Sequence, residues 1–234
     1  KDDQAIAEYT KAIEISPNLT AAHVNRGDVY TEQGKYDEAI GDYNKAIEMS
    51  PNLAEAYNNR GNTYSKQGKY ELAMADQTKA IEISPNFAEA YINHGAIYYE
   101  KGEYEKAISD FSRAIQINPN FPEAYINRAT VYTRKHLYDQ AIADCTKALE
   151  INPNIAQAYN IRGTIYMRKG HYDEAIKDLT KALEMNSAYA VAYYNRALAY
   201  KNKGQYNKAL TDFNKALEMN PPTVHVYFDK AETC

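Results

Sequence analysis

The residues with the most suggestive chemistry in this chain are an asparagine and an arginine that stand side by side several times. They occur in "AYNNRG" at 56–61, and variants of this hexapeptide recur at 22–27, 90–95, 124–129, 158–163 and 192–197. A side-chain amide offers a hydrogen-bond donor and an acceptor together, so it can pair with both groups of a peptide backbone. A guanidinium is a permanent cation with five donors, which suits a carboxylate. The repeated pair indicates either that the asparagine and the arginine belong to one polar site or that each has a separate role.

The spacing of these hexapeptides indicates that the chain is one unit copied several times. Asn25, Asn59, Asn93 and Asn127 are each 34 residues apart, and a fixed period of this size is typical of repeat architectures. Full copies then run 20–53, 54–87, 88–121, 122–155, 156–189 and 190–223. Residues 1–19 form the back part of a copy, and residues 224–234 form the front part of another.

Each copy is predicted to contain two helices. Tyr57, Arg60 and Tyr64 lie at helical spacing on one face of the first, and Ala73 and Ala80 do so in the second. The "SPN" that follows the second helix in this copy ends it, because proline disfavours helix in the residue before it. The asparagine and the arginine are thus expected on the first helix of every copy.

This 34-residue helix–turn–helix unit resembles the tetratricopeptide repeat, and the resemblance covers the whole chain. The family pattern places a small residue, a tyrosine and alanines at fixed offsets. The small residue is Gly27, Gly61, Gly95 or Gly163, with Ala129 and Ala197 in two copies, and the tyrosine is Tyr30, Tyr64, Tyr98, Tyr132, Tyr166 or Tyr200. Tryptophan, which the family pattern contains, is absent. The resemblance implies an all-α, right-handed superhelical solenoid of antiparallel helix pairs over residues 1–234.

Two copies depart from the pattern at a turn. Glycine is expected to end the first helix at Gly68 and its equivalents, but His136 takes this place in the 122–155 copy. A left-handed backbone costs a non-glycine residue about 1 kcal/mol. In the 156–189 copy, Ser187 replaces the proline after the second helix. We expect these two copies to be locally less stable than the others.

The arginine is predicted to serve packing. Neighbouring residues on a helix point about 100° apart, so Asn59 and Arg60 do not share a face. Arg60 shares the stripe of the tyrosines, and a charge in such a place needs a partner. The predicted ion pairs, each with an aspartate of the second helix, are Arg26–Asp42, Arg60–Asp76, Arg128–Asp144, Arg162–Asp178 and Arg196–Asp212. The alternative is a solvated aspartate that pairs with the lysine three residues later.

The asparagine is predicted to serve binding. In the tetratricopeptide family, the matching face of the first helix lines a concave groove, so the resemblance implies a ladder of amides: Asn25, Asn59, Asn93, Asn127 and Asn195. It is similar to the asparagine ladder in the repeat superhelix of O-linked N-acetylglucosamine transferase. Such a row would hold an extended peptide by its backbone, several rungs being needed because each hydrogen bond contributes about 1 kcal/mol net. Alternatively, these side chains only face water or brace adjacent copies. Ile161 interrupts the row.

The rest of the expected groove is partly apolar and partly charged. The apolar candidates are Ile92, Tyr99, Ile126 and Tyr194. Glu55 and Glu89 lie early in the array, whereas Arg134 and Arg168 lie late. This gradient would orient a ligand of opposite polarity, unless the charges are simply solvated.

Composition argues against several other classes of function. The formal net charge is -4 over 234 residues, which does not favour nucleic acid as a partner. No apolar run is long enough to span a membrane. No two histidines lie one helical turn apart, no catalytic or phosphate-binding motif occurs, and Cys145 takes a core slot. We expect no enzyme activity, no metal and no cofactor.

The sequence therefore predicts a protein–protein interaction scaffold that binds an extended peptide or partner segment in its concave groove. One alternative is a substrate-recruiting domain of a larger, glycosyltransferase-like enzyme. Another is a self-stacking module, because residues 1–19 and 224–234 carry apolar side chains without a partner helix, as expected for head-to-tail association. A cytoplasmic location is favoured over other compartments.

Overall fold

The computed structural model describes residues 2–219 and 224–233, and in these ranges all regular structure is α-helical. The helices are α1 (Asp2–Ile15), α2 (Thr20–Glu32), α3 (Tyr36–Met49), α4 (Ala54–Lys66), α5 (Tyr70–Ile83), α6 (Ala88–Glu100), α7 (Tyr104–Ile117), α8 (Pro122–Arg134), α9 (Tyr138–Ile151), α10 (Ala156–Arg168), α11 (Tyr172–Met185), α12 (Ala190–Asn202), α13 (Tyr206–Met219) and α14 (Val224–Ala231). Each predicted full copy contains one pair of them. The predicted all-α class and the pairing of helices are confirmed.

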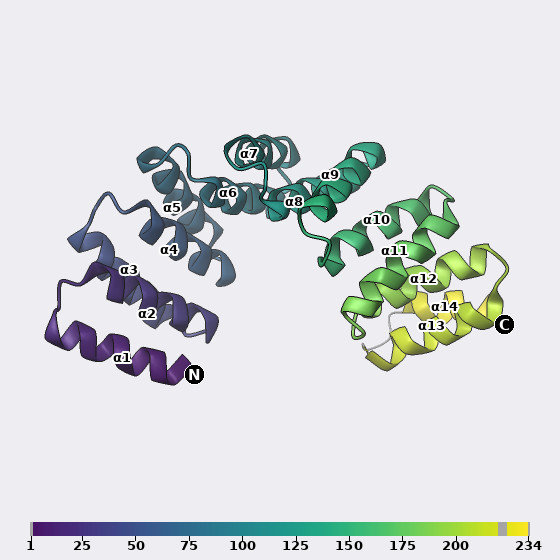
Figure 1. Ribbon diagram of the computed structural model, residues 1–234, viewed down its shortest axis with the longest axis horizontal. Helices are drawn as coiled ribbons and strands as arrows, with labels where there is room; N and C mark the ends of the chain where they lie inside the picture. Colours follow the sequence, from purple (N-terminus) through teal and green to yellow (C-terminus); the bar gives the residue numbers. More distant parts are fainter. Residues whose placement is uncertain (1, 220–223, 234) are drawn as a thin grey trace. The chain divides into compact units, whose positions relative to one another are not determined.

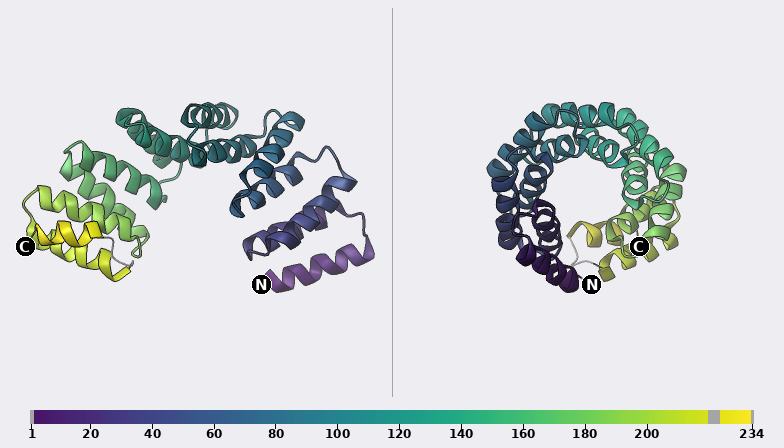
Figure 2. Two further views of the ribbon diagram at one scale, coloured as in Figure 1. Left: turned by 180° about the vertical axis from the view of Figure 1, so that it is seen from behind. Right: turned by 60° about the vertical axis from the view of Figure 1, so that its left-hand side comes forward.

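Contacts divide the chain into two compact units, Lys1–Pro119 with α1 to α7 and Asn120–Cys234 with α8 to α14. Within each unit, consecutive helices lie side by side and run in opposite directions (Figure 1). Figure 2 shows the same order from behind. Each helix from α2 to α6, and from α9 to α13, packs against the helix before it and the helix after it. Each unit is thus a stack of helix pairs; a single solenoid over 1–234 stays a prediction.

A glycine with left-handed backbone closes the turn inside most copies. At the end of α4, Gly68 has a φ of 72°. The Lys69 N–H donates to the Tyr64 carbonyl and the Gly68 N–H to the Ser65 carbonyl, both at 2.9 Å. These two bonds form a Schellman motif, which satisfies carbonyls that the helix end would leave unpaired. The predicted role of Gly68 is confirmed.

His136 holds the same left-handed conformation without being glycine. Its φ is 59°, and its Nδ1 lies 2.9 Å from the Tyr138 hydroxyl oxygen. We expect His136→Gly to raise the free energy of unfolding by up to about 1 kcal/mol, because glycine adopts this backbone without steric cost. Urea denaturation measures the change. The reverse substitution at an equivalent turn, Gly170→His, is expected to lower stability by a similar amount, and a loss of stability in His136→Gly would contradict the argument.

Small residues let the two helices of a copy approach closely. Ala73 and Ala80 of α5 are completely buried. An added Cβ at Gly61 of α4 would come within 2.8 Å of the Gln77 Nε2 of α5. Alanine and glycine at these crossing points therefore set the distance between the first and the second helix.

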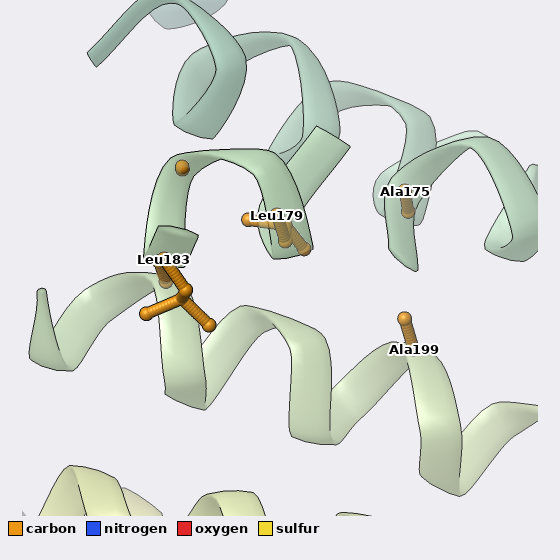
Figure 3. Packing of buried hydrophobic residues seen from close by; sticks show 6 residues of the cluster. Ala175, Leu179, Leu183 and Ala199 are labelled. Atoms are coloured by element: carbon orange, nitrogen blue, oxygen red, sulfur yellow. The ribbon is translucent and has the colours of Figure 1, made fainter. Parts of the chain in front are cut away.

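Larger side chains fill the space between successive copies. Figure 3 shows Ala175, Leu179 and Leu183 of α11 on the side that meets α12, which contributes Ala199. Cys145 occupies the slot of Leu179 in α9 and is completely buried. The predicted core position of this thiol is confirmed, and burial raises its pKa to about 12. The thiol therefore stays protonated at neutral pH and is a poor nucleophile.

Candidate functional site

The candidate residues lie on the first helices of the copies, α2, α4 and α6 in the first unit and α8, α10 and α12 in the second. Asn59 and Arg60 of α4 contact different neighbours: Asn59 bonds to Asp28 of α2, and Arg60 bonds to Asp76 of α5. The prediction that these adjacent residues do not share a face is confirmed for this copy, and the binding role of the asparagine stays a prediction.

Arg60 ties the two helices of its own copy together. Its Nε donates to Oδ2 of Asp76 and its Nη2 to Oδ1, both at 2.7 Å. Every other predicted pair forms the same fork, at 2.6–3.0 Å: Arg26–Asp42, Arg128–Asp144, Arg162–Asp178 and Arg196–Asp212. These aspartates are buried, so the prediction is confirmed and the alternative of a solvated aspartate is wrong. The hydrogen bonds to Asp76 raise the pKa of Arg60 above its ordinary value.

The same guanidinium also reaches the preceding copy, which the sequence analysis missed. Arg60 Nη1 donates to the Asn44 Oδ1 of α3 at 2.6 Å. Thr10, Thr146 and Thr180 accept the equivalent bonds from Arg26, Arg162 and Arg196 at 2.9–3.0 Å. The guanidinium carbon lies 5.5 Å from the ring centroid of Tyr57 and 6.0 Å from that of Tyr64, within range of cation–π attraction. A detectable signal was present: a polar residue stands 16 residues before each of these arginines, as the aspartate stands 16 after it.

Two of the three predicted asparagines of the first unit, Asn59 and Asn93, take part in a connected hydrogen-bond network. Asn59 Nδ2 donates to Asp28 Oδ1 at 2.9 Å, and Asn58 Nδ2 donates to Asn59 Oδ1 at 3.0 Å. Asn93 Nδ2 of α6 in turn donates to Asn58 Oδ1 at 2.9 Å. Asn58 is buried, Asn59 and Asn93 are half-buried, and Asn25 is exposed. The amides of α4 and α6 are thus braced against each other and against the Asp28 carboxylate of α2.

Asp28 is the one carboxylate in that network. Its Oδ1 also accepts a bond from the Tyr43 hydroxyl of α3 at 2.7 Å. Burial raises the pKa of Asp28 above its ordinary value, the bonds from Tyr43 and Asn59 oppose the shift, and the negative charges of Glu55 and Glu32 add to it. Asp28 was not among the predicted site residues, because no other copy carries an aspartate in its slot.

In the second unit, one of the predicted amides forms a hydrogen bond to the preceding first helix. Asn195 of α12 is buried, and its Nδ2 donates to the Thr164 Oγ1 of α10 at 2.8 Å. This bond matches the bond from Asn59 to Asp28, since each spans 31 positions. Asn127 of α8 is half-buried.

The apolar candidates are less accessible than a binding groove requires. Ile92 and Ile126 are buried, with exposed fractions of 8% and 4%. Tyr99 is half-buried, with its ring centroid 5.8 Å from that of Tyr104. The Tyr194 hydroxyl donates to the Asp229 Oδ2 of α14 at 2.6 Å, and burial, aided by this bond, raises the pKa of Tyr194 to about 12. Tyr194 therefore anchors the last described helix.

Two charged candidates are exposed in the second unit, and a hollow lies beside one amide of the first unit. Arg134 and Arg168 are exposed at the ends of α8 and α10. In the first unit, a hollow of about 490 Å³ opens between the starts of α4 and α6. It is lined by Leu53, Ala54, Glu55, Asn59, Ser84, Phe87 and Glu89. A hollow with an apolar part, two carboxylates and one amide suits part of an extended peptide better than a compact cofactor.

A second contact repeats between copies and was also missed. The residue after each of five first helices contacts an acidic residue near the start of the second helix in the preceding copy. Gln33 Nε2 donates to Asp3 Oδ1 at 3.1 Å, and Gln67 Nε2 donates to Asp37 Oδ1 at 3.0 Å. Lysine replaces glutamine in the Lys101–Glu71, Lys169–Asp139 and Lys203–Asp173 pairs. The sequence did contain a signal for this contact. A Gln or Lys always stands 30 residues after an Asp or Glu.

Two further features are absent from residues 2–219 and 224–233. No group of three or more histidine, cysteine or acidic side chains there has the arrangement of a metal site. None of the helices in these ranges combines the length and apolar character that crossing a membrane demands.

Stacked antiparallel helix pairs, stapled by an arginine and faced by amides, define an α-helical repeat protein. Family models described as tetratricopeptide repeat match residues 54–87, 122–155 and 190–221, and also 8–41, 77–109 and 145–177. A model described as TPR repeat matches 27–68, 95–135 and 163–204. The chain belongs to the tetratricopeptide repeat family.

Solved structures similar to this chain have the same repeat fold. MamA is 33% identical, with a TM-score of 0.60, over 69% of this chain and 94% of its own. YrrB, described as a TPR protein with an unusual peptide-binding site, is 28% identical, with a TM-score of 0.65, over 81% of this chain and 97% of its own. A chain of the APC/C hetero-tetramer Cut9–Hcn1 is 18% identical, with a TM-score of 0.87, and this chain spans 46% of its length. A comparison with curated protein sequences gave no match.

Proposed function

We propose that this chain is a non-catalytic scaffold that holds an extended peptide or partner segment against the first-helix face of its copies. The observation that carries the proposal is the network of Asn58, Asn59 and Asn93 beside the hollow of the first unit. Amides that are already oriented lose little conformational entropy when a ligand binds, so each hydrogen bond they form retains more of its value. The peptide-binding site named for YrrB supports the same class of ligand.

The charges of the face support a partner of mixed polarity. Glu55 and Glu89 are exposed in the first unit, and Arg134 and Arg168 are exposed in the second. Basic residues of a bound segment would be favoured at the first unit and acidic residues at the second, since like charges placed together are disfavoured.

The triple variant Asn59→Ala/Asn93→Ala/Asn127→Ala tests this function. Partners are first recovered from source lysate with the unchanged chain, and the affinity of a purified partner is then measured for each variant. We expect the affinity to fall about 100-fold, since three hydrogen bonds contribute about 1 kcal/mol each. The matched control is Asn18→Ala/Asn154→Ala/Asn207→Ala, three exposed asparagines outside the first helices. Both variants must melt like the unchanged chain, and equal affinity in all three proteins would reject the proposed face.

Head-to-tail self-association is a second candidate, favoured by exposed apolar side chains on α14 and at the end of α1. Ile15 is 86% exposed, Leu19 43% and Tyr227 53%. We expect the mass measured by light scattering to rise with concentration and to stop rising in Ile15→Lys/Tyr227→Lys. A constant monomer mass would exclude stacking. Recruitment of substrates to a larger enzyme would use the same first-helix face, and the discovery of a catalytic domain in the same gene product would favour it.

A further inference from the structure

We propose that Asp28 positions the amides of the first unit so that the carbonyl oxygen of Asn93 is presented to a hydrogen-bond donor of the bound segment. The proposal rests on the proposed function of this face and specifies the hydrogen-bond polarity that a partner must have at the Asn93 position. Asp28 is a positioning residue in this scheme, because it acts through Asn59 and Asn58.

The direction of the network follows from the chemistry of its end point. An ionised carboxylate can only accept hydrogen bonds, so Asn59 must turn its Nδ2 towards Asp28, where the two atoms lie 2.9 Å apart. The Oδ1 of Asn59 then faces the Nδ2 of Asn58 at 3.0 Å. The Oδ1 of Asn58 in turn faces the Nδ2 of Asn93 at 2.9 Å. Each amide has its oxygen and nitrogen on opposite sides, so one orientation fixes the next.

The oxygen left over is that of Asn93. No residue that the structure describes donates a hydrogen bond to this Oδ1, and Asn93 is half-buried. Its two lone pairs suit a backbone N–H, a hydroxyl or an ammonium group. Glu89 stands one helical turn before Asn93 and is exposed, so a positively charged donor is preferred over a neutral one.

The second unit lacks the residues that form this hydrogen-bond network. Thr164 takes the slot of Asp28, and Tyr194 takes the slot of Asn58 before Asn195. Among the described residues of the second unit, only one bond of this network has a counterpart: Asn195 donates to Thr164 at 2.8 Å. Thr164 therefore serves as a control whose substitution affects one amide only.

Two substitutions separate the positioning role from a merely structural one. Asp28→Ala removes the acceptor; the copy 88–121 carries alanine in the same slot, at Ala96. Asp28→Asn keeps an acceptor oxygen at the same place. The Tyr43 hydroxyl keeps a neighbour in both, because it lies 3.2 Å from Thr31 Oγ1. Equal melting temperatures are required before the variants are compared.

The probes are N-methylacetamide, which has an N–H donor, and N,N-dimethylacetamide, which has none. The NMR signal of the Asn93 carboxamide carbon is followed in the full chain with labelled asparagine. We expect a response about fivefold larger to the first probe, the equivalent of one hydrogen bond. Asp28→Ala is expected to abolish this preference, Asp28→Asn to retain it, and Thr164→Val to alter Asn195 but not Asn93. Equal responses to both probes in the unchanged chain, or a preference that survives Asp28→Ala, would overturn the proposal. Neither probe requires a partner protein, so this outcome is separate from the test of the scaffold function.

Discussion

Asp178→Ala is expected to lower the free energy of unfolding by about 3 kcal/mol, the low end of the cost of breaking a buried ion pair. Arg162 would lose two hydrogen bonds, at 2.7 and 3.0 Å, and keep its charge. Its side chain is only 17% exposed, so water would replace the lost carboxylate incompletely. That residual access to water places the estimate at the low end.

The same helix offers a matched control for Asp178→Ala. Lys181 and Glu184 of α11 form an ion pair at 2.8 Å, but both side chains are at least half exposed. Glu184→Ala is therefore expected to change stability by less than about 0.5 kcal/mol. Urea denaturation of the two variants measures the difference. The double variant Arg162→Met/Asp178→Leu is expected to recover most of the loss, because an apolar pair leaves no charge buried. Similar losses from Asp178→Ala and Glu184→Ala would show that the fork is no stronger than a surface pair.

The sequence was sufficient to predict contacts that recur with the period of the repeat. Arg162 and Asp178 occupy fixed slots in a copy, and helical spacing placed both on the faces that meet. The prediction stopped at one partner because Thr146 belongs to the preceding copy, and its contact depends on how copies stack. Stacking geometry arises from side-chain volumes at many positions, which a spacing rule does not contain.

The spacing of the repeat could not predict features that do not recur in every copy. Asp28 and Asn58 form the network of the first unit, but neither residue type recurs in every copy. Ile92 was predicted to belong to the apolar part of the groove. The structure buries Ile92, and it also buries Asn58 in the same slot of the preceding copy. This slot faces a neighbouring helix, and residue type alone gave no indication of that.

Gly163→Val is expected to lower the free energy of unfolding by about 2–3 kcal/mol, the usual cost of overpacking. An added Cβ would lie 2.8 Å from the Leu179 Cγ and 3.3 Å from the Ala175 carbonyl oxygen. The leucine can move, but the backbone oxygen cannot move without a shift of α11. The matched control is Gly41→Val in α3, where an added Cβ meets nothing within 4 Å. That change is expected to be neutral or slightly stabilising, since glycine is a poor helix former.

The two large effects should also depend on each other. Gly163 is adjacent to Arg162, so a valine that separates α10 from α11 also lengthens the fork from Arg162 to Asp178. In the Gly163→Val background, Asp178→Ala is therefore expected to cost less than it does alone, with a coupling of about 1 kcal/mol. A double-mutant cycle by urea denaturation measures this coupling. Strict additivity would mean that the fork tolerates the separation, and that the close approach at glycine and the arginine staple hold the helix pair independently.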